Sequence, residues 1–443
     1  MTRLAATLFA GVSLVLGPAA PAIASHNSDV HTDNLSVVGR DGFPFGTDLA
    51  FKGKLVAAGA GDWDGSYPTG VYFDDVSKPE PKRLGFANCD GWHSDPDWVG
   101  QYVVQSHDDG AANDTCDWNG ESAGKEGVGV IDASNPRRPE PVGFAETIHG
   151  AHNLTTVGNT GLVYVSSYNL TNPADVDGVS IVDVGADPVN PPVEFLEFPD
   201  LDADPTQYDE MENRSGDLPD SMGCHDIGLD LARDLAYCAG ITETMVWDIS
   251  DPRAPAIISI IRNPGVNIHH GARPSVDGDI LIVNDEWLGA AGAGSGCAVP
   301  SAPTGALWFY DVSDPTSPQL QGFWSPPTPE PLEDFCTSHF YDTFEDSDGR
   351  ELVVSSWYEH GIYVLDFSDP TSPQEVANYD PEGANFWGAY EHRGYLYANS
   401  FAPATLLASD PAFEDQGGIW TFRLEGYSPS GKPGSGAERG KRG

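Results

Sequence analysis

The sequence has few basic residues for its length. Its 443 residues include 22 lysines and arginines against 67 aspartates and glutamates, which gives a formal net charge of −45. A surface with this excess of negative charge repels the phosphates of nucleic acids and the anionic headgroups of membranes. We therefore expect neither nucleic acid nor a membrane as a partner, and we interpret the acidic residues as a solvated surface.

The sequence also lacks the signatures of common catalytic sites. It contains no Gly-x-Ser-x-Gly nucleophile elbow, no glycine-rich phosphate loop and no dinucleotide-binding fingerprint. Ser221 lies near His225 in the chain, but nothing in the pattern orients the two as a nucleophile and its base. The sequence motifs therefore identify no catalytic site of these kinds.

Long apolar stretches are missing except at the N-terminus. There Arg3 precedes apolar residues 4–16, and Ala22-Ile23-Ala24 has the small-x-small pattern of a signal-peptidase site. The stretch is too short and too rich in alanine and glycine for a membrane span. We expect residues 1–24 to be a signal peptide that is cleaved after Ala24, and the mature protein to be secreted.

What the sequence does contain is a repeat. Six times an apolar strand ends in Asp and leads into a turn that contains Pro, and a degenerate seventh copy at 418–424 has Arg423 instead of the Asp. The side chain of this Asp can accept backbone N–H bonds within the turn, so we interpret it as structural. The motif aspartates are Asp75, Asp132, Asp183, Asp248, Asp311 and Asp366.

Each repeat has four strand-like segments, which predicts a β-propeller. One such sheet cannot bury both of its faces alone, and radial stacking of several sheets solves this. The seventh repeat lacks a fourth strand, whereas residues 35–39 form a strand without a partner. We predict an all-β fold, a seven-bladed β-propeller of four-stranded blades whose N-terminal strand completes the last blade. The domain should span 25–427, with a disordered Gly/Ser-rich, basic tail at 428–443.

The strand-and-turn motif resembles the LVIVD repeat family of secreted, propeller-like proteins of bacteria and archaea. The closest copies are residues 180–184 (SIVDV) and 361–370 (GIYVLDFSDP). The resemblance covers nearly the whole mature chain, from Leu35 to about Tyr427, and implies the architecture. It implies no chemistry, because the family as a whole has no assigned activity.

The six cysteines are an even number in a chain expected to be exported, and this predicts disulfides. Cys224 and Cys238 flank a hairpin of the fourth repeat. The other four precede inner strands or lie in long loops that share one face of a propeller. We predict the pairs Cys89–Cys116, Cys224–Cys238 and Cys297–Cys336. A cysteine-based metal site is the alternative, which the absence of a C-x-x-C spacing disfavours.

Histidines occupy equivalent positions, just before the inner strand, in five repeats. They are His93, His152, His225, His270 and His339. Because inner strands border the central channel, five imidazoles should surround one mouth of it, with Trp387 at this position in the seventh repeat. Two neighbours in the chain, His149 and His269, are candidates to join them. On the same face we expect His107, Asp108, Glu243, Glu286, Glu359 and His360.

Two interpretations of these histidines are open. In one, each is a structural residue whose hydrogen bonds tie its inner strand to the next blade. In the other, part of the set binds a transition metal or a small anionic ligand. The metal would be copper or zinc, because neutral imidazole is a good ligand for both. The channel is too wide for all five to reach one ion, so adjacent blades plus a doubled site such as His269/His270 or His149/His152 would form the cluster. The predicted metal ligands are His93, His152, His225, His269, His270 and His339.

Calcium is a less favoured ion. Segments 62–65, 175–178 and 346–349 resemble the start of calcium loops, but none continues to the glutamate at the twelfth position, so we interpret them as hairpin turns. An acidic insertion at 199–223 should form a loop over the channel face.

Two functional classes follow. The first is a monomeric, non-catalytic secreted scaffold whose loop-rich face binds a protein, a glycan or a small ligand. The second is a metal-dependent, oxidase-like enzyme with copper or zinc among the histidines, analogous in fold and histidine content to the selenium-binding-protein and methanethiol-oxidase group. Ring nitrogens that converge within about 4–5 Å and are held by carboxylates would favour the metal. Splayed rings bonded to backbone would favour the structural role.

Overall fold

The structure is a computed structural model, and it describes residues 30–62, 67–89, 91–108, 116, 125–167, 178–198, 223–286, 305–326, 336–381, 383–401 and 416–432. The expected signal peptide at 1–24, most of the acidic insertion at 199–223 and Cys297 lie outside these residues. Within the described part of the chain, no helix is long and apolar enough to cross a membrane.

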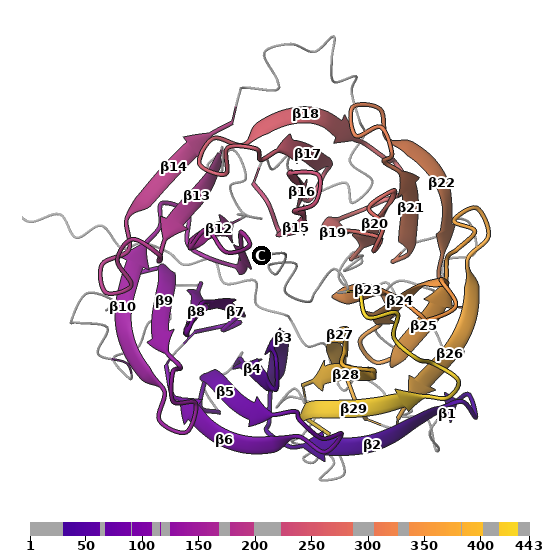
Figure 1. Ribbon diagram of the computed structural model, residues 1–443, viewed down its shortest axis with the longest axis horizontal. Coiled ribbons are helices and arrows are strands. Elements are labelled where there is room, and N and C mark those ends of the chain that lie inside the picture. Colours follow the sequence, from indigo (N-terminus) through magenta and orange to yellow (C-terminus); the bar gives the residue numbers. More distant parts are fainter. Residues whose placement is uncertain are drawn as a thin grey trace, which may run out of the picture.

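Seven antiparallel sheets surround a central axis as the blades of a β-propeller (Figure 1). In six of them, four consecutive strands run in order from the axis to the rim. The first two blades are β3 (Gly46–Lys52), β4 (Leu55–Ala60), β5 (Gly70–Asp75) and β6 (Lys82–Ala87), then β7 (Pro96–Val99), β8 (Tyr102–His107), β9 (Gly127–Asp132) and β10 (Glu140–Glu146). The next two are β11 (Asn153–Thr156), β12 (Leu162–Ser166), β13 (Gly178–Asp183) and β14 (Val193–Glu197), then β15 (Asp226–Asp230), β16 (Leu235–Ala239), β17 (Thr244–Asp248) and β18 (Ala256–Ile261). The fifth and sixth are β19 (His269–Pro274), β20 (Ile280–Asp285), β21 (Leu307–Asp311) and β22 (Gln319–Trp324), then β23 (Tyr341–Glu345), β24 (Glu351–Ser356), β25 (Ile362–Asp366) and β26 (Gln374–Asp380).

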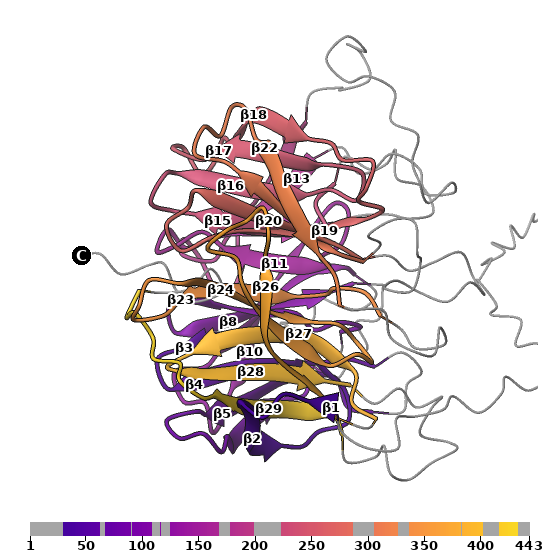
Figure 2. The same cartoon turned by 90° about the vertical axis from the view of Figure 1, so that its right-hand side faces the viewer.

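The seventh blade is closed by the N-terminal strand, as predicted. It contains β27 (Phe386–His392), β28 (Tyr395–Ser400) and β29 (Gly418–Leu424), with β2 (Leu35–Asp41) as the fourth strand at the rim. A further short strand that the sequence did not indicate, β1 (Val30–His31), pairs with β26 and makes the sixth blade five-stranded. Figure 2 shows β1 and β2 beside β26 and β29, at the junction of the two ends of the chain.

The hydrophobic core lies between the blades. The second strand of each blade is almost entirely buried, because a neighbouring blade covers each of its faces. Tyr164 of β12, Ile181 of β13 and Trp247 of β17 belong to one apolar cluster that fills the space between the third and fourth blades. The outermost strands are largely half-buried or exposed. Polar residues at the ends of the inner strands lie around the central axis.

The motif aspartate is a turn residue, as we interpret it from the sequence. In five repeats its Oδ1 accepts the backbone N–H of the residue two positions later, at 2.8–3.0 Å. In the third repeat, Asp183 instead accepts the N–H of Ala186 and pairs with Arg253 of the next blade. The calcium-like segment at 346–349 is likewise a hairpin turn, in which Asp346 accepts the N–H groups of Asp348 and Arg350.

Two of the three predicted disulfides are present. Cys89 pairs with Cys116, and Cys224 with Cys238. Cys336 is also disulfide-bonded, and its predicted partner Cys297 lies outside the described residues.

The tail begins later than its composition suggests. Residues 428–432, which we assigned to the disordered segment, pack along the hairpin between β23 and β24. The carbonyl of Ser428 accepts the N–H of Ser347, and Lys432 Nζ lies 2.7 Å from Glu345 Oε2. The free backbone groups of this hairpin give the polar chain hydrogen-bond partners that composition alone does not reveal. Residues 433–443 lie outside the described part.

Candidate metal centre

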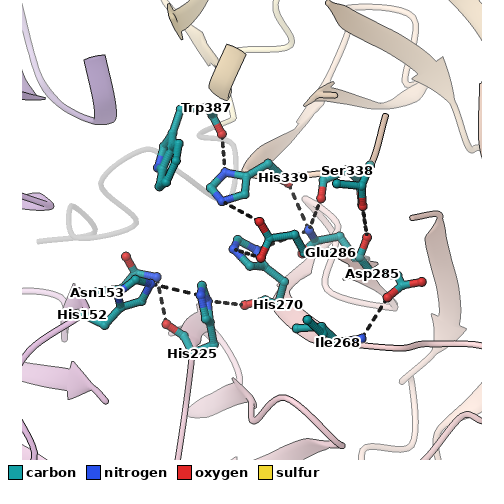
Figure 3. A network of polar contacts seen from close by, with 12 residues as sticks. His152, Asn153, His225, Ile268, His270, Asp285, Glu286, Ser338, His339 and Trp387 are labelled. Carbon is teal, nitrogen blue, oxygen red and sulfur yellow. Dashed lines mark hydrogen bonds and ion pairs between the residues drawn. The ribbon is translucent and has the colours of Figure 1, made fainter. Parts of the chain in front are cut away.

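The five equivalent histidines lie side by side around the axis and, together with Trp387, form a closed circle that we call the histidine ring. Figure 3 shows four of them with Trp387. The distances between neighbouring ring centres are 4.2 Å for His93–His152, 4.5 Å for His152–His225, 4.0 Å for His225–His270, 4.2 Å for His270–His339, 4.4 Å for His339–Trp387 and 5.3 Å for Trp387–His93. The spacing of the repeat thus places one such side chain per blade, in six of seven blades. In the first blade, Thr47 donates a hydrogen bond to the carbonyl of His93 instead.

The Nδ1 atoms of four of these imidazoles face hydrogen-bond acceptors. The Asp108 carboxylate lies 2.5 Å from His93 Nδ1 and 3.1 Å from His152 Nδ1. His225 Nδ1 lies 3.1 Å from the carbonyl oxygen of His270, and His339 Nδ1 lies 2.5 Å from that of Trp387. A carbonyl or carboxylate oxygen only accepts, so each Nδ1 carries the proton and each Nε2 of a neutral ring offers its lone pair.

Two of these lone pairs face each other. His152 Nε2 and His225 Nε2 are 3.0 Å apart, although they come from different blades (Figure 3). With both Nδ1 atoms protonated toward their acceptors, neither neutral ring has a proton to share between the two Nε2 atoms. The arrangement therefore calls for a positive charge between them, either an added proton or a metal ion.

A carboxylate completes the other side of the ring. Glu286, directly after β20, places Oε2 3.5 Å from His270 Nε2 and Oε1 3.7 Å from His339 Nε2. The hydroxyl of Tyr358 donates a hydrogen bond to Glu286. Two sets of three residues have potential ligand atoms that all lie within 4.8 Å of one another. They are His93, Asp108 and His152, and His225, His270 and Glu286.

Burial keeps the imidazoles of four ring residues neutral, namely His152, His225, His270 and His339. Burial lowers the pKa of His152 to about 4, and it lowers the pKa of His225 and His339 well below the ordinary value. Burial alone would raise the pKa of Asp108, but the attraction of His93 and the hydrogen bonds from both histidines hold it below its usual range. Burial raises the pKa of Glu286 to about 8, so this carboxyl lacks a compensating cation. Neutral imidazoles are the form that binds metals.

The doubled sites that we expected do not form. His269 is fully buried, but its Nδ1 lies 2.8 Å from the hydroxyl of Thr244, away from the ring. Successive side chains of a strand point to opposite faces, so His269 and His270 of β19 cannot both face the axis. His149 packs edge-on against Phe195 outside the ring, with 5.4 Å between the two ring centres.

The second-strand residues contribute unequally. Asp108 and Glu286 reach the ring, as their positions at strand ends indicate. Glu243 instead pairs with Arg262 at 2.9 Å, and His107 packs edge-on against Phe144. Tyr358, which contacts Glu286, went unnoticed in the sequence. Its only signal is its place two residues after β24, one position beyond the equivalent of Glu286 after β20.

Comparison with known proteins supports the architecture. Residues 358–381, which contain β25 with its Asp turn and all of β26, match the LVIVD repeat family. The protein is a seven-bladed β-propeller that contains an LVIVD repeat. No curated protein matches the chain.

Solved structures resemble this LVIVD-repeat propeller in fold. The β-propeller domain of Cps50 (Swd1) from Myceliophteria thermophila has a TM-score of 0.52 and 13% identity, over 88% of this chain and 99% of that one. U3-55K has a TM-score of 0.52 and 11% identity, over 88% and 98%. A putative 6-phosphogluconolactonase from Bacteroides uniformis has a TM-score of 0.52 and 12% identity, over 78% and 89%. At these identities the likeness shows the propeller fold alone.

Proposed function

We propose that the protein is a secreted metal-binding β-propeller that holds a transition-metal ion, copper or zinc, in its histidine ring. The observation that carries this function is the 3.0 Å approach of His152 Nε2 to His225 Nε2, with both Nδ1 atoms turned to acceptors. Nitrogen ligands of zinc lie about 2.0–2.1 Å from the metal, so two ligands at tetrahedral or right angles are about 2.8–3.4 Å apart. The observed separation falls within this interval.

The surroundings of the ring support the same function. Metal-binding histidines usually donate their other ring N–H to a carboxylate or a backbone carbonyl, which fixes the tautomer and the ring orientation. Asp108 plays this part for His152, and the carbonyls of His270 and Trp387 play it for His225 and His339. Glu286, beside His270, supplies an oxygen ligand.

A purely structural role explains less of the geometry. His225 and His339 do tie their blades to the backbone of the next one, but other side chains make such ties as well. Asn153 Nδ2 donates to the carbonyl of His225 at 2.8 Å, and Asp95 Oδ2 accepts the N–H of Leu154 at 2.6 Å. None of these ties requires two Nε2 atoms to face each other.

The expected secretion accords with the disulfides, which form and persist in oxidising compartments. An exported, disulfide-bonded propeller with an empty ring would be a scaffold, and its partner would be a protein, a glycan or a small ligand. Loading of the ring distinguishes the two functions.

Elemental analysis by mass spectrometry tests the proposal. The full chain is purified from its secretion route without chelator, together with His270→Ala and with a triple variant in which His152, His225 and His270 are replaced by Ala. His269→Ala is the matched control, because His269 is the chain neighbour of His270 and equally buried, yet lies outside the ring.

We expect near-stoichiometric copper or zinc in the wild-type protein and in His269→Ala, and its loss in the triple variant. Thermal unfolding confirms that each variant is folded. A folded wild-type protein without metal, even after incubation with Zn²⁺ or Cu²⁺, overturns the proposal, as does metal that the triple variant retains. Loading would justify a screen for oxidase activity.

A further inference from the structure

A cavity of about 340 Å³ runs along the inner strands, from residues near the histidine ring to the opposite end of the axis. The ring residues stand at the start of the inner strands, whereas Gly100 and Asn159, which line the cavity, follow the ends of β7 and β11. Both of these turn residues are exposed, so the cavity opens to solvent there. Its volume is within the range of pockets that hold small molecules.

The cavity has a negative formal charge. It is lined by Asp48, Asp95, Asp97 and Asp226, against Lys52 and Arg273. Arg273 Nη2 lies 3.5 Å from Asp226 Oδ2, so the cation is directed toward that carboxylate. Lys52 Nζ is 4.9 Å from the centre of the Trp98 ring, which shows that an ammonium group is accommodated on this aromatic wall.

Most of these carboxylates already have hydrogen-bond donors. Asp97 accepts the N–H groups of Trp98 and Thr156, both at 2.7 Å. Asp48 accepts the N–H of Leu49 and the hydroxyl of Tyr390.

Asp95 differs from the others. It is 3% exposed, and its Oδ2 accepts the N–H of Leu154, whereas its Oδ1 has no hydrogen-bond donor among the described residues. The carboxyl group of Asp48 lines the same cavity close to it. A buried carboxylate oxygen without a donor, close to a second carboxylate, is a place where a cation relieves an unfavourable charge.

The spacing of the carboxylates selects the kind of cation. Among the described residues, sets of three ligand atoms within 4.8 Å of one another are found at the histidine ring and not in this cavity, so a small metal ion would not be enclosed here. An ammonium group donates three hydrogen bonds in separate directions. Phe51, Trp98 and Leu229 line the same cavity and would contact a hydrocarbon chain.

We propose that this cavity binds an organic cation, a primary alkylammonium ion whose charged group pairs with Asp95 and whose chain packs against Phe51 and Trp98. The site is separate from the histidine ring and does not depend on metal.

Calorimetric titration of the full chain with n-hexylammonium chloride tests this site, with 1-hexanol as a neutral ligand of the same length. We expect hexylammonium to bind at least about tenfold more tightly than the alcohol, because a buried charge-assisted hydrogen bond contributes about 1.5–3 kcal/mol. Asp95→Asn should lower the affinity for hexylammonium by a similar factor. Asp342→Asn is the matched control, since Asp342 is also buried and accepts a backbone N–H of the next blade's inner strand, but does not line the cavity.

Equal affinities of the wild-type protein for hexylammonium and 1-hexanol overturn the proposal, whether or not the variants fold. Equal losses in Asp95→Asn and Asp342→Asn also overturn it, because they would reflect a general loss of packing between blades. His270→Ala should bind hexylammonium like the wild-type protein, which separates this site from the metal centre.

Discussion

The Asp108 carboxylate, just after β8, contacts His152 Nδ1 of the next blade at 3.1 Å. The same oxygen is 2.5 Å from His93 Nδ1, so a single carboxylate orients imidazoles of two blades. In the proposed metal site Asp108 is therefore a positioning residue, which holds the rings whose Nε2 atoms would face the ion.

Asp108→Asn should weaken Zn²⁺ binding about 10–100-fold, because loss of such an outer carboxylate typically reduces metal affinity by this factor. The amide keeps the size of the side chain but removes the charge that holds both Nδ1 protons. Competition with a chromophoric chelator measures the affinity. Asp311→Asn, in an exposed turn far from the ring, should bind Zn²⁺ like the wild-type protein. Unchanged affinity in Asp108→Asn would show that Asp108 does not orient the ligands.

His269 should make stability depend on pH. Burial lowers its pKa to about 3 in the folded protein, against about 6.5 in the unfolded chain. Between these values the unfolded chain binds the extra proton, so the contribution of this group is fully present above about pH 6.5 and is lost as the pH falls toward 3. The stability of the wild-type protein relative to His269→Gln should rise with pH in this window, by at most about 1.4 kcal/mol per pH unit, and be constant above it. Urea unfolding from pH 4 to 8 measures this difference, and a difference independent of pH would contradict the assignment.

The Cys224–Cys238 disulfide should stabilise the fourth blade. It links positions separated by 14 residues, and closing a loop of this length contributes about 3 kcal/mol to the free energy of unfolding. A Cys224→Ala/Cys238→Ala variant should lose about this amount in urea unfolding. It should also bind metal more weakly, since Cys224 immediately precedes His225. A variant as stable as the wild-type protein would show that the native contacts alone hold this hairpin.

Closure of the propeller between its sixth and seventh blades should depend on Leu35. This residue is 1% exposed, pairs with Leu424 of β29 and packs in the apolar cluster between the sixth and seventh blades. Leu35→Ala should cost about 2–5 kcal/mol, as large-to-small changes in a core do. Val30→Ala in β1, where the side chain is 48% exposed, should change stability by about 0.5 kcal/mol or less. Similar losses of stability in the two variants, measured by urea unfolding, would contradict the prediction that closure depends on Leu35.

The architecture could be predicted because each blade restates the same local pattern. The Asp turns mark the third strand of every repeat, and the missing fourth strand of the seventh repeat has a visible counterpart at residues 35–39. Strand β1 was missed because two residues, Val30 and His31, carry no periodicity. Their pairing with β26 depends on the tertiary fold, which places the N-terminal segment beside that strand.

The histidine ring was predictable in position but not in chemistry. Repeat spacing places His152 and His225 at equivalent points, yet it does not reveal which nitrogen faces inward. That depends on acceptors such as the carbonyl of Trp387, whose location follows from tertiary packing. The failure at His269 has a simpler origin, because adjacent residues of a strand alternate in direction and only one could point to the axis. The free oxygen of Asp95 has no sequence signal at all.

The N-terminal segment contributes strands to both the sixth and the seventh blade, and β2 then leads directly into the first. The N-terminal segment is therefore held against the last strands of the chain, and the blades form a closed circle. If a protease cut the connection between β14 and β15, the fragment with β1 and β2 would still be paired with β26 and β29 of the other fragment. Both fragments would therefore stay associated. A chain whose termini were moved to this cut would keep every blade intact.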